Sequence, residues 1–137
     1  MTTTKQRGDA GEHYVAAMLG FAGHPVSIMP DNWPGYDLMV DALGRQLRVQ
    51  VKTLTRSAFE GTGWNPGVSP ETPYDFLAVL VADGQHGTEG WLLPVDIVQK
   101  WAHKPKAEAK SREWWLPKKY LKNELAEYRN RWDLLTH

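Results

Sequence analysis

The chain has 137 residues, of which 42% are apolar and 23% charged, which is typical of one globular domain. No apolar run reaches the ~20 residues of a membrane-spanning helix, and the first residues lack the apolar stretch of a signal peptide. There is no cysteine, which excludes disulfides, a thiolate nucleophile and a cysteine zinc site. We therefore expect a single cytoplasmic domain over residues 1–137, with a core at about 7–100.

The net charge of zero conceals an asymmetry. Residues 1–99 carry six basic and eleven acidic side chains, whereas residues 100–137 carry ten basic and five acidic ones. A chain divided in this way can bind cations at one place and polyanions at another, although a solvated basic face is the alternative. Seven tryptophans cannot all lie in one small core. Trp33, Trp64 and the pair Trp114–Trp115 are candidates for stacking on a ligand or for packing at an interface.

The order of apolar patterns predicts an α/β domain with a mixed central β-sheet flanked by helices. Helical spacing of apolar residues, alternation and short apolar runs mark the elements, and glycine and proline mark the breaks. In chain order, the expected elements are a helix over residues 7–22, a strand over 25–30, hairpin strands over 36–41 and 46–52, a long loop over 56–73, a strand over 76–82, a turn over 83–87, a strand over 89–95, a short helix over 97–101 capped by Asp96, and a last helix over about 117–135.

The length of the hairpin loop determines which residues of the two strands lie opposite each other. A two-residue loop at 43–44 and a four-residue loop over 42–45 give the same register, and both place Asp37 opposite Gln50. On the second strand, alternation places Gln50 and Lys52 on one face. The sequence therefore predicts that Asp37, Gln50 and Lys52 lie side by side on two adjacent strands.

The expected last helix carries an apolar stripe with spacings of 4, 3, 4 and 3 residues, the pattern of one buried helix face. This stripe docks either on the domain itself or on a second copy of the chain. Its members are Leu121, Leu125, Tyr128, Trp132 and Leu135.

Asp37, Gln50 and Lys52 offer a carboxylate, a neutral carbonyl oxygen and a cationic group. A hard divalent cation binds oxygen ligands from side chains held at fixed spacing. A lysine beside such a cation can orient a water and stabilise the charge that builds on a phosphate. Glu12, on a helix that can pack beside the hairpin, would supply a second carboxylate. The set is suited to metal-assisted hydrolysis of a phosphodiester, and a solvated polar face is the alternative interpretation.

Three short motifs resemble the PD-(D/E)XK nuclease superfamily. They are Gly8-Asp9-Ala10-Gly11-Glu12, Pro34-Gly35-Tyr36-Asp37-Leu38 and Arg48-Val49-Gln50-Val51-Lys52-Thr53. The chain is similar to the branch in which glutamine replaces the acid of the last motif, which includes bacterial group I intron homing endonucleases. Archaeal Holliday junction resolvases are relatives that carry an acid there. The resemblance covers about residues 7–100 and implies a restriction-endonuclease-like core, followed here by a C-terminal helix.

Carried over residue by residue, the resemblance implies that Glu12 and Asp37 bind the metal. It implies that Gln50 is a carbonyl ligand or positions a water, and that Lys52 is the catalytic lysine. The expected protein is a DNA endonuclease that hydrolyses phosphodiester bonds with Mg²⁺ or Mn²⁺. The departure is Gln50, whose neutral side chain lowers the negative charge of the site. The alternatives are a catalytically inactive nuclease-fold module that binds DNA or protein, and an interaction protein with no nucleic-acid role.

The basic segment over about 101–137 is expected to be helical and to contact the DNA backbone. One such domain cuts one strand, so we expect a homodimer or a larger homo-oligomer, built partly on the apolar stripe. The candidate phosphate contacts are Lys104, Lys106, Lys110, Arg112, Lys118 and Lys119.

Overall fold

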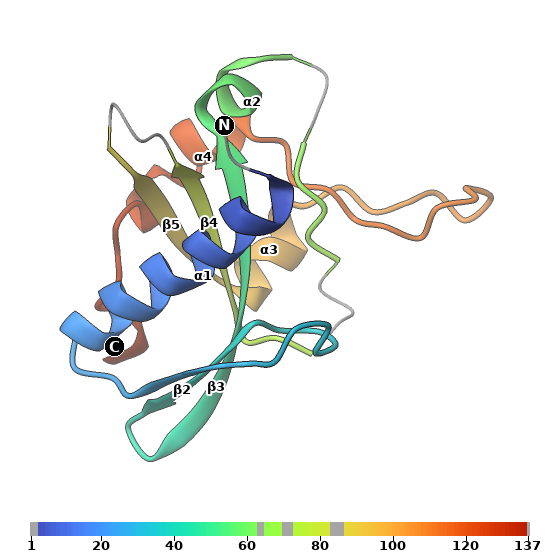
Figure 1. Ribbon diagram of the computed structural model, residues 1–137. Coiled ribbons are helices and arrows are strands. Elements are labelled where there is room, and N and C mark those ends of the chain that lie inside the picture. Colours follow the sequence, from blue (N-terminus) through green and yellow to red (C-terminus); the bar gives the residue numbers. More distant parts are fainter. Residues whose placement is uncertain (1–2, 63–64, 70–72, 83–86, 137) are drawn as a thin grey trace.

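The computed structural model describes residues 3–62, 65–69, 73–82 and 87–136 and contains a mixed five-stranded sheet flanked by helices, as expected (Figure 1). The strands lie in chain order across the sheet, with β3 and β4 parallel and every other neighbouring pair antiparallel. The strands are β1 (Val26–Ile28), β2 (Leu38–Ala42), β3 (Arg45–Thr55), β4 (Phe76–Ala82) and β5 (Glu89–Pro94). The helices are α1 (Thr4–Phe21), α2 (Arg56–Glu60), α3 (Val95–Trp101) and α4 (Lys119–Lys122), followed by the 3-10 turns η1 (Ala126–Tyr128) and η2 (Leu134–Thr136). Trp64 and residues 83–86 of the predicted turn lie outside the described residues.

The predicted hairpin is confirmed over β2 and β3. Leu38 pairs with Val49 and Ala42 pairs with Arg45, which is the predicted register. The loop is the two-residue alternative, Leu43–Gly44, and both of its residues have positive φ, 52° and 75°. Two such residues in succession form a type I′ turn, whose twist matches that of the flanking strands.

The first helix begins at Thr4, earlier than the spacing of apolar residues predicts. The Thr3 hydroxyl accepts a hydrogen bond from the Gln6 N–H at 3.1 Å, and the Gln6 side chain accepts one from the Thr3 N–H at 2.9 Å. This capping box starts the helix before its glycine-containing motif. Gly11 and Glu12 therefore lie in the middle of α1 rather than in its first turns.

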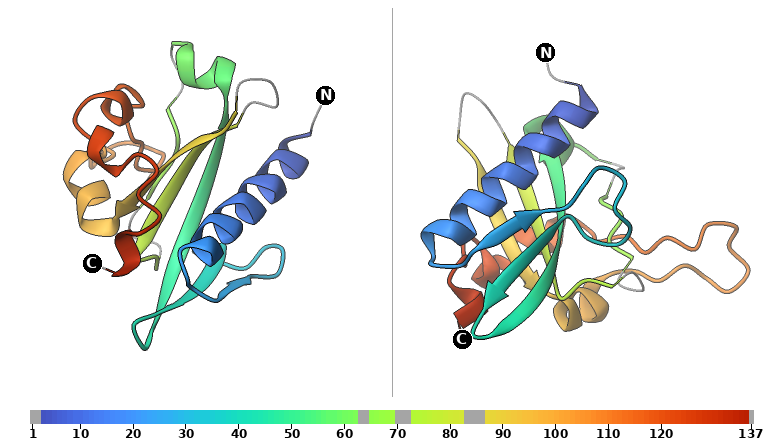
Figure 2. Two further views of the ribbon diagram at one scale, coloured as in Figure 1. Left: turned by 90° about the vertical axis from the view of Figure 1, so that its left-hand side faces the viewer. Right: turned by 60° about the horizontal axis from the view of Figure 1, so that its bottom comes forward.

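Figure 2 shows α1 on one face of the sheet and α3 with the C-terminal segment on the other. A hydrophobic core lies on each face. On one face, Val15 and Leu19 of α1 are fully buried against the strands. On the other, the indole N–H of Trp91 donates to the Leu121 carbonyl at 2.8 Å within a cluster that includes the C-terminal segment. None of the helices described is long and apolar enough to cross a membrane.

The predicted last helix is wrong. In place of one helix over 117–135, the chain forms the short α4 and the two turns η1 and η2. Asn130 has a φ of 57°, which interrupts helical geometry, and its N–H donates to the Gly90 carbonyl at 2.7 Å. The C-terminal segment thus crosses the edge of β5. Because β5 is an edge strand, a segment that covers it protects it from pairing with another chain.

The apolar stripe of this segment is divided between the two cores. Leu121 and Leu125 are buried on the α4 side of the sheet, whereas Trp132 and Leu135 are buried on the α1 side. A single straight helix cannot present one stripe to both faces of a sheet, and the broken backbone allows the chain to wrap around it. These four side chains are occupied within the chain, so the predicted use of the stripe in a homodimer is not supported.

Two local predictions also need correction. Residues 56–60 of the predicted loop form α2, because the Thr55 hydroxyl caps this turn by accepting from the Ala58 N–H at 3.1 Å. α3 begins at Val95, so Asp96 lies in the first helical turn and is not its cap. Its charge is nevertheless favourable there, near the positive end of the helix dipole.

Candidate active site at the edge of β3

β3 extends beyond its neighbour β2, and the predicted site lies at this open edge. β2 begins at Leu38, opposite Val49, whereas β3 continues to Thr55. Asp37 lies where the strands part. Its N–H donates to the Val49 carbonyl at 2.9 Å, and its Oδ2 accepts from the Val51 N–H at 2.8 Å. Because the N–H groups of a strand point within the plane of the sheet, the Asp37 carboxylate lies beside the edge of β3 rather than above a face.

Gln50 and Lys52 lie on the face of β3 that is opposite α1, as alternation predicts. They pair with Leu77 and Val79 of β4, which belong to the core on that side. The pairing of β2 with β3 ends at Leu38 and Val49, one pair before the predicted pair of Asp37 and Gln50. Asp37 nevertheless lies beside Gln50 at the strand edge, because its hydrogen bonds join it to Val49 and Val51, the neighbours of Gln50 in the chain.

α1 brings Glu12 to this edge from the other face of the sheet. Burial raises the pKa of Glu12 from 4.5 to about 7, and the negative charge of Asp37 adds to the rise. The close approach of α1 depends on Gly11, because a Cβ there would lie 1.9 Å from Oγ1 of Thr53. The helix and the strand edge together therefore place two carboxylates within electrostatic reach of each other.

The site has unfavourable features that a cation would relieve. Burial raises the pKa of Asp37, while the Val51 N–H and the positive charge of Lys52 act in the opposite direction. Oε1 of Gln50 is buried and has no hydrogen-bond partner within the described ranges. Unpaired buried oxygens and partly desolvated carboxylates are costly alone, and they are the ligands that a hard divalent cation prefers. The donor set therefore fits such a cation.

This donor set contains two carboxylates and one amide. In the part of the chain that the structure describes, no group of three His, Cys, Asp or Glu side chains could hold a metal ion. The third oxygen donor at the edge of β3 is the Gln50 amide.

Asp75 and Arg48 hold the neighbouring part of β3 against β4. The Asp75 carboxylate accepts from the Arg48 N–H at 2.8 Å and from its guanidinium at 3.2 and 3.3 Å, and the Asp75 N–H donates to the Arg48 carbonyl at 2.8 Å. Burial acts to raise the pKa of Asp75, but Arg48 holds it below its usual value. This clamp fixes β3 just before Gln50. Sequence reasoning missed it, because no local pattern marks partners 27 residues apart.

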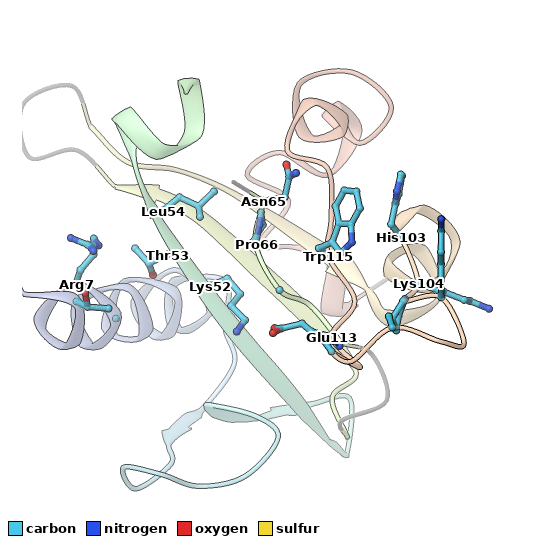
Figure 3. Close-up of a pocket in the computed structure, with 17 residues that line it drawn as sticks. Arg7, Lys52, Thr53, Leu54, Asn65, Pro66, His103, Lys104, Glu113 and Trp115 are labelled. Carbon is cyan, nitrogen blue, oxygen red and sulfur yellow. Dashed lines mark hydrogen bonds between the residues drawn. The ribbon is translucent and has the colours of Figure 1, made fainter. Parts of the chain in front are cut away.

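A cleft of about 1070 Å³ opens beside Lys52 (Figure 3). One wall is formed by the first turns of α1 and by residues 52–54 of β3, and the other by residues 65–67 and by residues 103–115. Lys52 thus belongs both to the site at the edge of β3 and to the cleft. The charged residues that line the cleft are Arg7, Lys52, Lys104, Lys106 and Glu113.

Residues 103–115 form a projection that we call the finger. Its base is closed by His103 and Trp115, whose backbones exchange hydrogen bonds of 2.8 and 3.2 Å, and the chain between them extends away from the sheet (Figure 1). The finger carries four of the predicted phosphate contacts, all exposed, and two of these reach the cleft. The four are Lys104, Lys106, Lys110 and Arg112.

The other two predicted phosphate contacts lie beside α4. The Lys118 amine donates to the Ala58 carbonyl at the end of α2, and its side chain is half-buried. Lys119 is exposed, with its amine 5.6 Å from the centroid of the Tyr120 ring. The structure therefore does not bring Lys118 and Lys119 to the cleft, and the finger is the part of the basic segment that adjoins Lys52.

Sequence reasoning did not single out His103, Asn65 or Glu113, which all line the cleft. They come from segments that are distant in the chain from the hairpin and carry no recognisable motif. Only the tertiary structure brings residues 65–67 and the base of the finger to the wall opposite Lys52.

An open strand edge with two carboxylates, an amide and a lysine defines a nuclease-like class of protein. The family model described as PD-(D/E)XK endonuclease matches residues 2–112, and the chain belongs to this family. Among solved structures, that of a bacterial homing endonuclease, I-Ssp6803I, matches with a TM-score of 0.67 at 24% sequence identity, covering 98% of this chain and 92% of that one. A search of curated proteins found no match. The predicted resemblance and fold class are therefore confirmed.

Proposed function

We propose that this protein is a cytoplasmic, divalent-metal-dependent DNA endonuclease that hydrolyses phosphodiester bonds. The observation that carries the proposal is the Asp37 carboxylate, which the Val51 N–H holds at the open edge of β3. Glu12 approaches it from one face, and Gln50 and Lys52 lie on the other. Membership of the PD-(D/E)XK endonuclease family supports a nuclease with a DNA substrate.

Glu12, Asp37 and Gln50 would hold the cation, which we propose to be Mg²⁺ or Mn²⁺. The buried, unpaired Oε1 of Gln50 and the raised pKa values of both carboxylates support this assignment. When bound, a divalent cation supplies Lewis-acid stabilisation of phosphate charge and activates water at neutral pH.

Lys52 contributes positive charge at the boundary between the edge of β3 and the cleft. In this position its amine would orient the attacking water and stabilise the negative charge that develops on the phosphate. Lys104 and Lys106, on the opposite wall of the cleft, would neutralise nearby phosphates of the same DNA and fix its position.

The neutral side chain of Gln50 favours one second candidate, a catalytically inactive nuclease-fold module that binds DNA or protein. A site with two carboxylates attracts a divalent cation less strongly than a site with three. Calorimetric titration with Mg²⁺ and Mn²⁺ distinguishes the candidates. The endonuclease requires metal binding that Asp37→Asn abolishes, whereas the inactive module has none.

The central experiment is cleavage of plasmid and branched DNA with Mg²⁺ or Mn²⁺. We expect cleavage by the wild type, none by Lys52→Ala, and normal cleavage by Lys100→Ala, which removes the same charge from an exposed position on α3. Retained cleavage by Lys52→Ala contradicts the proposed role of Lys52. Absence of both wild-type cleavage and Asp37-dependent metal binding favours the inactive module.

Cleavage of both strands of a duplex requires two active sites, so we propose that the active form is a homo-oligomer. It would use a surface other than the apolar stripe, four of whose five members are buried within the chain. Sedimentation of the protein with and without DNA tests this, and a monomer in both conditions contradicts it.

A further inference from the structure

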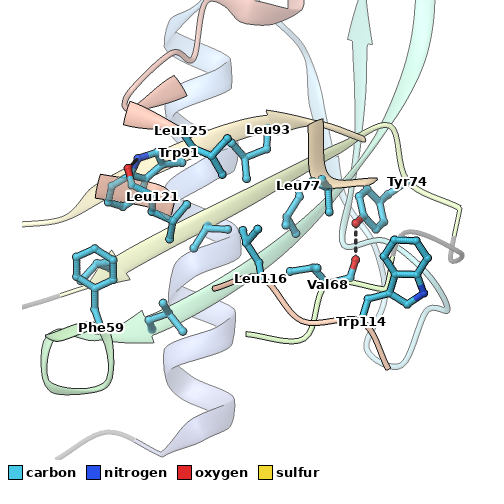
Figure 4. Close-up of a cluster of buried hydrophobic side chains, with 14 residues drawn as sticks. Phe59, Val68, Tyr74, Leu77, Trp91, Leu93, Trp114, Leu116, Leu121 and Leu125 are labelled. Carbon is cyan, nitrogen blue, oxygen red and sulfur yellow. Dashed lines mark hydrogen bonds between the residues drawn. The ribbon is translucent and has the colours of Figure 1, made fainter. Parts of the chain in front are cut away.

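The adjacent pair Trp114 and Trp115 is divided between the core and the cleft. Trp114 is only 9% exposed and packs near Val68 and Tyr74 in the cluster of Figure 4. Trp115 is 39% exposed and lines the cleft beside Lys52 (Figure 3). Successive side chains of extended backbone point in opposite directions, so the burial of one indole presents the other to the cleft.

Trp115 is held in place from two sides. Its backbone forms bridges to both Gly67 and His103. The imidazole of His103 packs against the indole, with ring centroids 4.3 Å apart and planes inclined by 42°. Tyr120 lies behind His103, at 6.5 Å between centroids. An exposed indole fixed in this way is a preorganised stacking surface, since little side-chain entropy remains to be lost when a flat ligand binds.

Glu113 places a carboxylate in the same cleft. Gly67 leaves room for it, because a Cβ on Gly67 would lie 1.8 Å from Oε1 of Glu113. No ion pair or side-chain hydrogen bond of this carboxylate occurs among the described residues. In Figure 3 the side chains of Glu113 and Lys52 extend toward each other from opposite walls. A carboxylate repels phosphate, so the surface around Glu113 and Trp115 does not suit the DNA backbone. The cationic groups of the cleft, Lys52 on one wall and Lys104 and Lys106 on the other, do suit it.

The cleft therefore places cationic groups, Lys52 among them, beside an aromatic and acceptor surface formed by Trp115 and Glu113. A single nucleotide has the matching parts, a phosphate on one side and a base on the other. Every base can stack on an aromatic ring, and a carboxylate accepts a hydrogen bond from the exocyclic amino group of cytosine. Bases within a duplex are already stacked and paired, so only an unpaired or extruded base could occupy this wall.

We propose that the cleft binds one unpaired base of the DNA, stacked on Trp115 and donating from an exocyclic amino group to Glu113. The site selects DNA with a local unpaired base that carries an exocyclic amino group, such as cytosine, over thymine, and it places the phosphate of that nucleotide on the side of Lys52. This inference rests on the proposed function only in taking DNA as the ligand.

The test measures binding without cleavage, by fluorescence anisotropy in the presence of a chelator. The probes are one labelled duplex in three forms: fully paired, with one bulged cytosine, and with one bulged thymine. We expect the wild type to prefer the bulged cytosine to the paired duplex by between about 5-fold and about 150-fold, the range for stacking of one base on an aromatic ring.

Three variants show which side chains are responsible for the preference for the bulged duplex. Trp115→Ala is expected to abolish it and Trp115→Phe to restore part of it, whereas Glu113→Ala is expected to retain stacking and lose the preference for cytosine over thymine. Trp33→Ala is the control, because Trp33 is 46% exposed in the turn before β2 and does not line the cleft.

Equal binding of all three duplexes, or a preference that survives Trp115→Ala, overturns the inference. Because the readout is binding in chelator, failure of the cleft proposal is distinct from failure of the nuclease proposal. A protein that cleaves DNA in Mg²⁺ and shows no preference for the bulge refutes only the cleft site. A protein that binds none of the duplexes refutes both.

Discussion

Gly11 of α1 and Thr53 of β3 lie so close together that a Cβ on Gly11 would be 1.9 Å from the threonine Oγ1 and 3.1 Å from its Cβ. Gly8, one turn earlier on α1, has nothing within 4 Å of the same added atom. The helix therefore presses on the sheet at the residue immediately before Glu12. The position of a candidate metal ligand depends on the absence of a side chain at its neighbour.

The two glycines predict opposite effects of the same substitution. Gly8→Ala is expected to stabilise the protein by about 0.5–1 kcal/mol, because alanine restricts the unfolded chain and favours the helix. Gly11→Ala is expected to destabilise it by about 1–3 kcal/mol, because the added atom overlaps Thr53. Urea unfolding of both variants measures this. Equal effects would contradict the close packing, and partial rescue of Gly11→Ala by Thr53→Ala would support it.

The raised pKa of Glu12 predicts a pH dependence of stability in the absence of metal. The folded protein keeps a proton on Glu12 up to about pH 7, whereas the unfolded chain releases it near 4.5. The free energy of unfolding should therefore fall as pH rises from about 4.5 to about 7. Glu12→Gln lacks this loss and should exceed the wild type at pH 8 by roughly 1 kcal/mol, allowing for solvent screening.

Urea unfolding from pH 4 to pH 8 in chelator checks this prediction. The difference between Glu12→Gln and the wild type should be small at pH 4 and grow through neutrality. Glu124→Gln, an exposed carboxylate on the C-terminal segment, serves as the matched control. If the difference in unfolding free energy between Glu12→Gln and the wild type does not change with pH, burial does not raise the pKa of Glu12 in the folded protein.

Because residue 50 carries a neutral amide, we expect the affinity for Mg²⁺ to change when the number of carboxylates at the site changes. Gln50→Glu adds a third carboxylate at the edge of β3 and should tighten Mg²⁺ binding on the order of tenfold, while Asp37→Asn should abolish it. Calorimetry at pH 7.5 measures both. Unchanged affinity in Gln50→Glu would show that residue 50 does not face the cation.

The finger predicts a separation of DNA binding from catalysis. Each phosphate contact contributes about 0.9 to the slope of log affinity against log salt. Replacing Lys104, Lys106, Lys110 and Arg112 together by alanine should reduce the slope by up to about 3.6 and weaken binding to all sequences. Lys52→Ala should abolish cleavage and leave binding nearly intact. Loss of binding in Lys52→Ala with no effect of the finger variant would place the DNA elsewhere.

The way the C-terminal segment wraps around the sheet leads us to expect that stability depends strongly on one buried ring, the indole of Trp132. Trp132 is 6% exposed, lies against Gly90 of β5 and meets Tyr14 of α1 edge-to-face at 6.3 Å. Trp132→Ala should cost about 3–5 kcal/mol of unfolding free energy, as for other large core deletions. Trp33→Ala, at an exposed site, should change it by about 0.5 kcal/mol or less. Similar losses in both variants would contradict the buried position of Trp132.

Local sequence patterns were sufficient for the elements that form from neighbouring residues. Alternation on both sides of Leu43–Gly44 determined the hairpin and its register, because a two-residue loop and a period of two leave one pairing that buries the apolar face. The same period placed Gln50 and Lys52 together. The motifs around Glu12, Asp37 and Lys52 indicated the nuclease family, because their chemistry requires particular residues at particular spacings.

Only the tertiary structure decided how distant segments meet. The stripe from Leu121 to Leu135 has helical spacing, but the chain breaks at Asn130 to cover both faces of the sheet, because burial against two cores outweighs local helix propensity. Asp37 left the ladder for the strand edge because β2 ends there. The cleft beside Lys52 exists because residues 65–67 and the base of the finger lie opposite β3, and no local pattern encodes a contact between segments so far apart in the chain.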